Sequence, residues 1–205
     1  MPSVFRAGSV ALLLGVLIGL VAQLSDNLVS ELHRVTSLGV PWLVAAFGVG
    51  ALWRDRGLGA LAGATALVTG TVVYYVLRVL GWGTLDPTIP IAIGWCLAAA
   101  GGGALFGAAG AAWRGGDARM RAGGAALVGG ALIGEALLLS TLWSGAGARL
   151  ALGFELMLGA LLPFALARRR MVVAALGLAL VVAVVVFVGE QGVRDALRET
   201  GWNGA

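Results

Sequence analysis

The stretch GGALIGEALLLSTLW, residues 129–143, decides the fold class because it places one carboxylate, Glu135, inside a run of apolar and small residues. A charged group in such a run lies either in a membrane or in a soluble core, and both positions are costly. The composition of the whole chain decides between the two. Hydrophobic residues make up 60% of the chain and charged residues only 12%, whereas a soluble domain has about 25% charged residues. These values, with a mean hydropathy of +0.96, predict an integral membrane protein.

The composition also limits the chemistry that the chain can support. One cysteine, Cys96, and one histidine, His33, leave no internal disulfide, no cysteine-based metal site and no histidine-pair haem site. The sequence holds no GxSxG, HExxH or Walker-type glycine loop. The basic residues are all arginines in short loops between apolar runs, which argues against a nucleic-acid partner. We therefore expect no catalytic residue, metal or cofactor, and the sequence leans away from an enzyme.

Seven apolar runs approach the length of about 20 residues that a membrane-spanning helix needs. The first run is longer than the core of a cleaved signal peptide, about 7–15 residues, so we interpret it as a retained helix. The second is short, and Pro41 fits its first turn. We predict an all-α bundle, an N-terminal helix followed by three hairpins, with a tail at residues 190–205 and spans at residues 7–24, 39–53, 57–80, 89–113, 122–143, 150–167 and 171–189.

The arginines predict the orientation of these spans. Nine lie at one end of the expected bundle and five at the other, and the turns RDR (54–56), RGGDARMR (114–121) and RRR (168–170) all belong to the richer end. The positive-inside rule assigns that end to the cytoplasm. We therefore predict a multi-pass protein of a bacterial-type plasma membrane, with its N-terminus inside and its C-terminus outside.

Small residues predict how the helices pack. The chain has 34 glycines, and Gly15/Gly19, Gly59/Gly63 and Gly130/Gly134 show the spacing that lets helix backbones approach in lipid. The run AAAGGGALFGAAGAA leads us to expect the helix at residues 89–113 in the centre of the bundle. The segment 51–77 also resembles the segment 111–138 at an offset of 60 residues. This similarity is either a true repeat or a convergence of sequences rich in Ala, Gly, Leu and Val.

Polar and aromatic side chains gather in the outer half of the expected bundle. At a rise of about 1.5 Å per residue, Glu135 lies about 12 Å from Trp143, and Glu155 lies about 8 Å from Leu150. Arg78 is the natural partner of either glutamate. Three interpretations follow: a solute pocket, a proton site at Glu135, or a buried Arg–Glu pair or snorkelling glutamate with only a structural role. The candidate site residues are Glu135, Glu155, Arg78, Tyr74, Tyr75 and Trp95.

The leading functional hypothesis is the binding or transport of a small solute through this outward-facing pocket. Arg78 would hold an anionic group, the two glutamates a cation or a hydrogen-bond donor, and the aromatic rings would form the walls. The rival hypothesis is a structural or accessory subunit whose Gly/Ala-rich helix faces dock another membrane protein or a second copy. A glycine stripe facing lipid would favour the rival, and a water-accessible cavity at Glu135 would favour solute binding.

Overall fold

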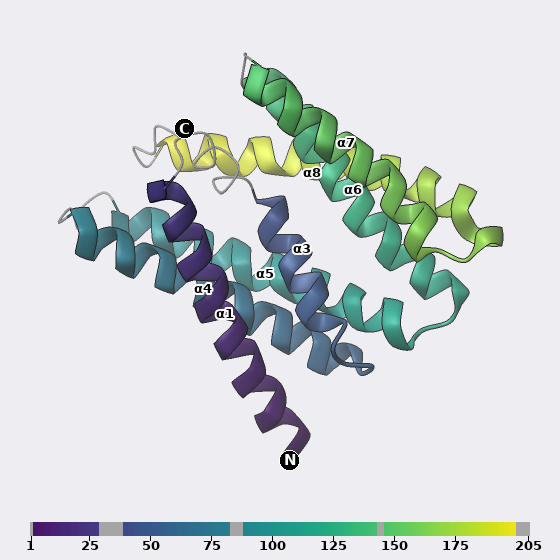
Figure 1. Ribbon diagram of the computed structural model, residues 1–205, viewed down its shortest axis with the longest axis horizontal. Coiled ribbons are helices and arrows are strands. Elements are labelled where there is room, and N and C mark those ends of the chain that lie inside the picture. The colour runs from purple at the N-terminus through teal and green to yellow at the C-terminus, as the bar shows by residue number, and fades with distance from the viewer. Residues whose placement is uncertain (1, 29–38, 83–87, 143–145, 200–205) are drawn as a thin grey trace.

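The computed structural model describes residues 2–28, 39–82, 88–142 and 146–199, and the regular structure of this part of the chain is helical (Figure 1). The expected all-α bundle of seven helices is confirmed, and each helix overlaps one predicted span. The helices are α1 (Pro2–Leu28), α3 (Val40–Gly50), α4 (Arg56–Trp82), α5 (Thr88–Gly115), α6 (Ala118–Leu142), α7 (Ala146–Leu166) and α8 (Val172–Glu199), with the 3-10 turn η1 at Arg169–Met171.

Six of these helices, all except α3, are long and apolar enough to cross a membrane. Their outward faces carry large apolar side chains that no other part of the described chain covers, among them Leu13 on α1, Leu97 on α5 and Val185 on α8. Such faces are stable only against lipid. The chain is therefore a multi-pass membrane protein.

Helix α3 is much shorter than its neighbours. It has 11 residues, which correspond to about 16 Å, whereas the hydrocarbon core of a bilayer is about 30 Å thick. It begins where the sequence predicts, with Pro41 in the first turn, but it ends at Gly50 rather than at residue 53. A helix of this length covers about half of the hydrocarbon core, so the donors of its first turn need a partner inside the protein.

The turns between α3 and α4, between α5 and α6, and between α7 and α8 lie at the same end of the bundle, at the lower right in Figure 1. We call this the arginine end because it carries Arg54, Arg56, Arg114, Arg119, Arg121 and residues 168–170. Helices α4, α6 and α8 run away from this end, and α3, α5 and α7 return to it. The arginine-rich turns of the sequence are thus gathered on one side.

The centre of the bundle is α6 rather than the glycine-rich α5, so this expectation was wrong. Of the α6 span, 78% is buried inside the protein, against 11% of the α5 span. The reason is that the α5 glycines serve close approach to α4 and α3 but leave the outward face of α5 uncovered. Gly103 and Gly107 pack against Gly63 and Gly59 of α4. Small residues allow two backbones to approach, but they do not surround a helix.

The other small-residue pairs are also used between helices of this chain. A Cβ added at Gly15 would lie 2.5 Å from the Ala66 carbonyl oxygen, which brings α1 against α4. A Cβ added at Gly134 would lie 2.6 Å from the Ala183 carbonyl oxygen, which brings α6 against α8. Both contacts join parallel helices. The sequence repeat itself stays a prediction.

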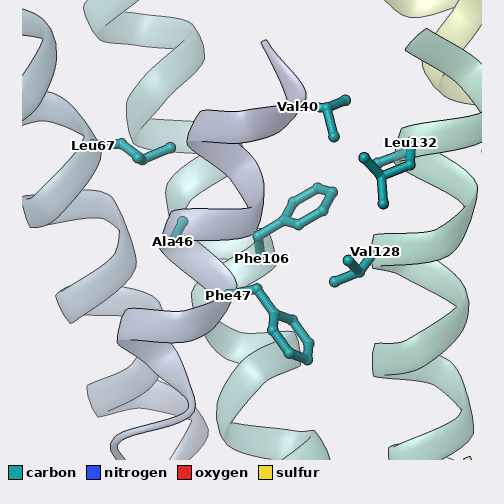
Figure 2. Close-up of a cluster of buried hydrophobic side chains, with 8 residues drawn as sticks. Val40, Ala46, Phe47, Leu67, Phe106, Val128 and Leu132 are labelled. Atoms are coloured by element: carbon teal, nitrogen blue, oxygen red, sulfur yellow. The ribbon is translucent and has the colours of Figure 1, made fainter. Parts of the chain in front are cut away.

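The largest cluster of buried apolar side chains surrounds α3. Figure 2 shows Phe47 of α3 and Phe106 of α5 directed toward Val128 and Leu132 of α6. Val40 and Ala46 of α3, Leu67 of α4 and Ala131 of α6 complete the cluster. The core therefore joins the helices that precede α6 to α6 itself, and it holds the short helix α3 in the middle of the protein.

Candidate functional site

Glu135 is completely buried, and its carboxylate binds the first backbone N–H groups of α3. Its Oε1 accepts hydrogen bonds from Gly39 N at 2.6 Å and from Val40 N at 3.1 Å, and its Oε2 lies 3.1 Å from Val40 N. Gly39, the N-cap residue, has no side chain with which to cap the helix. The carboxylate therefore satisfies donors that lipid could not, and it faces the positive end of the helix dipole.

Two further glutamates lie at the same depth as Glu135. Glu135, Glu155 on α7 and Glu190 on α8 are each six residues from the end of their spans, at Thr141, Arg149 and Ala196, which corresponds to about 9 Å. Glu190 acts electrostatically on both of the others. A Cβ added at Gly39 would lie 3.8 Å from Glu135 Oε1 and 3.9 Å from Glu190 Oε1. The carboxylates of α6 and α8 thus meet at the start of α3.

Arg194, one helical turn beyond Glu190, is the cation of this group. Its Nη2 lies 2.9 Å from Glu190 Oε1, and its Nε lies 3.3 Å from the same oxygen. The Arg194 and Glu190 side chains are only 6% and 13% exposed. The pair is therefore a buried ion pair rather than a surface contact. We call Glu135, Glu155, Glu190, Arg194 and the N–H groups of Gly39 and Val40 the acid site.

Glu155 differs from the other two glutamates because its Oε2 has no hydrogen-bond partner among the described residues. The residue is 6% exposed. Within the described chain no donor reaches its Oε2, and that oxygen is closed to solvent. Among the described residues, the acid site thus holds three carboxyl groups against one guanidinium and the α3 dipole, which counts for about half a positive charge. If all three were ionised, negative charge would exceed positive charge in a region where charge is costly.

Arg78 does not supply the missing charge. Its Nη1 donates to the Tyr74 hydroxyl at 3.2 Å on the same helix, and no ion pair joins it to Glu135 or Glu155 in the described part of the protein. The expected Arg78–glutamate pair is therefore replaced by the Arg194–Glu190 pair. The helix packing explains the difference, because α4 packs mainly against α1 and α5, whereas α6 packs against α7 and α8.

The predicted aromatic residues gather on the α4 side of α3. The Tyr74 and Tyr75 rings meet edge to face with centroids 5.2 Å apart, and Tyr74 meets Trp42 in the same way at 6.2 Å. Trp42 belongs to the first turn of α3. Trp95 is half-buried on α5 and is followed by Cys96, which lies near Tyr75. The aromatic group and the acid site thus approach the start of α3 from different helices.

The predicted site lacks Glu190 and Arg194 because the last predicted span ends at residue 189 and both residues fall in the predicted tail. The mixed charge of that tail contrasts with the apolar run before it. Helix α8 instead continues to Glu199. The spacing of Glu190 and Arg194, four residues apart, is the signal that could have identified a helical ion pair there.

Among the described residues, no group of three His, Cys, Asp or Glu side chains is arranged to hold a metal ion.

Comparison with known proteins identifies a family but no activity. No curated protein and no solved structure matches the chain. Residues 2–195 match a family of unknown function, DUF6518, and the chain belongs to that family.

Proposed function

We propose that this membrane protein binds or transports a small solute through the acid site. The observation that carries the proposal is Glu155, a buried carboxyl group whose Oε2 has no hydrogen-bond partner in the described chain and which lies beside Glu190. Ionisable residues within a membrane are rare, and those that are kept typically mark a path for a substrate, an ion or a proton.

The short helix α3 supports the same proposal. Many transporters build their substrate and ion sites from interrupted helices whose N-termini lie near the middle of the membrane. Helix α3 has about half the length of a span, and its first N–H groups face the carboxylate of Glu135. The short helix α3 resembles such half-helices in its length and in the position of its N-terminus beside buried carboxyl groups, which favours a binding site.

The charges of the acid site favour one class of solute. Three carboxyl groups against one guanidinium suit a solute with a positively charged nitrogen or several hydrogen-bond donors. Tyr74, Tyr75 and Trp95 would supply apolar contact from the α4 and α5 side, and Arg78 an anion contact there. We further propose that the arginine end is cytoplasmic in a bacterial-type plasma membrane, so that the solute arrives from outside.

The alternative is an accessory subunit that docks another membrane protein through glycine-rich faces. The pairs Gly15/Gly19, Gly59/Gly63 and Gly130/Gly134 all pack against other helices of the same chain. Of the described glycines with open space around them, only Gly189 and Gly192 lie within one helical turn of each other. This distribution disfavours docking through a glycine stripe.

The proposal is tested by the unfolding temperature of the purified protein in the presence of small amines, amino acids and neutral sugars. A bound solute at about 100 times its Kd adds about 2.7 kcal/mol to the stability. We expect a solute with a cationic nitrogen to raise the unfolding temperature of the wild type. Glu155→Gln should weaken that shift, and Glu199→Gln, at an exposed position on α8, should retain it. A shift that is equal in both variants would show that the solute binds without Glu155 and would contradict the acid site as its location. No shift with any solute would favour the accessory role.

A further inference from the structure

We infer that Glu155 carries a proton in this conformation and exchanges it when a solute occupies the acid site. The inference rests on the proposed function and deepens it by naming the coupling ion. The three carboxyl groups of the acid site differ in their hydrogen-bond and ion-pair partners, and these differences carry the inference.

Two of the three carboxyl groups have partners that stabilise the ionised form. Glu135 accepts hydrogen bonds from Gly39 N and Val40 N, at the positive end of α3. Glu190 forms an ion pair with Arg194 at 2.9 Å. Backbone N–H groups and a guanidinium both stabilise the ionised form of a carboxyl group. Among the described residues, the Oε2 of Glu155 has no comparable partner.

The surroundings of Glu155 favour a proton over a larger cation in this conformation. Its Oε2 accepts no hydrogen bond in the described chain and is closed to solvent. A hydrated metal ion or an ammonium group could reach that oxygen only if the surrounding atoms moved. A proton needs no space, and it removes the charge that burial makes costly.

The carboxyl groups near Glu155, Glu135 on α6 and Glu190 on α8, oppose its ionisation. The positive groups of the acid site lie against those two glutamates instead, because Arg194 pairs with Glu190 and the α3 N–H groups bind Glu135. On its own helix, Arg149 is exposed at the start of the span. Loss of the Glu155 proton would create a third negative charge beside Glu190. The proton therefore leaves for water when a positive group of the solute takes its place, and the total charge of the site is unchanged.

Infrared spectroscopy tests this inference without any solute. The protein is reconstituted in phosphatidylcholine vesicles, and the C=O stretching band of protonated carboxyl groups is followed while the pH is raised. We expect a band at neutral pH that disappears in alkaline buffer. Glu155→Gln should lack this band, and Glu199→Gln, as the matched exposed control, should keep it. Glu155→Asp retains a carboxyl group and should shift the band rather than remove it.

Two results would overturn the inference. One is a band that persists unchanged in Glu155→Gln, and the other is a wild-type spectrum without a protonated carboxyl band. Circular dichroism establishes that each variant is folded, and Glu155→Asp replaces Glu155→Gln if the latter does not fold. Because the spectra are recorded without solute, a negative result here differs from a negative result in the thermal screen, which would overturn the proposed solute function instead.

Discussion

At the scale of single residues, three glutamates with the same depth have three different environments. Glu135 binds backbone N–H groups, Glu190 binds Arg194, and the Oε2 of Glu155 has no donor within the described chain. The depth of a carboxyl group in the membrane therefore does not determine its role. Its partners decide whether it stabilises a helix end, completes an ion pair or is available to a ligand.

The buried ion pair predicts an asymmetry between single and double variants. Arg194→Met leaves Glu190 buried without its cation and should cost about 3–5 kcal/mol, as the loss of one partner of a buried pair does. Glu190→Gln combined with Arg194→Met removes both charges and should cost less than Arg194→Met alone. The unfolding free energies in mixed detergent micelles measure both. A double variant that is less stable than Arg194→Met would contradict this explanation, because it would show that the unpaired charge of Glu190 is not what destabilises Arg194→Met.

At the scale of elements, glycine spacing determines which helices approach each other closely, but it does not determine which helix lies at the centre of the bundle. Close approach explains why Gly134 faces α8 and why α5 and α4 touch, but it did not identify the central helix. Helix α6 is central because it packs against α3, α5, α7 and α8. The half-length of α3 follows from where its first N–H groups find Glu135, a partner that is distant in sequence.

The contact between α6 and α8 predicts opposite effects for two glycines. Gly134→Ala places a methyl group 2.6 Å from the Ala183 carbonyl oxygen and should cost about 1–3 kcal/mol, as overpacking does. Gly177→Ala meets nothing within 4 Å and should be neutral or stabilise α8 by up to about 1 kcal/mol through helix propensity. The unfolding temperatures of the two variants test the contact, and equal effects would contradict it.

The first turn of α6 predicts a pH-dependent effect. Hydrogen bonds from Met120 N and Arg119 N, together with the charges of Arg119 and Arg168, hold the pKa of Asp117 below its ordinary value. The stabilisation is therefore present above the unfolded pKa of about 3.9 and is lost as the pH falls through the lower folded value. Asp117→Ala should unfold at a lower temperature than the wild type at pH 7, and the difference should shrink in acid.

Asp117→Asn is the matched control for this prediction because it keeps an acceptor for the N–H groups but does not titrate. We expect it to retain most of the stability that Asp117→Ala loses at pH 7. A difference between Asp117→Ala and the wild type that stays constant down to strongly acidic pH would assign the effect to something other than the ionised cap.

At the scale of the whole molecule, composition and hydropathy were sufficient to predict a membrane bundle and the positions of seven helices. The depth of Glu135 and Glu155 could also be counted from the sequence. Their partners could not, because contacts between α6, α7 and α8 depend on packing that no local pattern records. Arg78 is the partner that the sequence suggests, because Glu190 and Arg194 lie beyond the predicted end of the last span at residue 189.

The proposed orientation predicts which ends of the protein react from outside. In a Cys96→Ser background, Glu199→Cys should react with a membrane-impermeant maleimide on intact cells. Arg170→Cys, at the arginine end, should react only after the membrane is permeabilised. Both residues are exposed in the structure. Labelling of both from the same side would contradict the proposed topology, and the reverse pattern would invert it.

The central claim is that Glu135 fixes the start of α3 inside the membrane and so creates the acid site. Amide hydrogen exchange tests it most directly, in the wild type and in Glu135→Gln, which lacks the charge and the second acceptor oxygen. We predict slow exchange throughout α3 in the wild type and faster exchange in α3 of Glu135→Gln, with α5 unchanged. Equal protection of α3 in both proteins would contradict the claim.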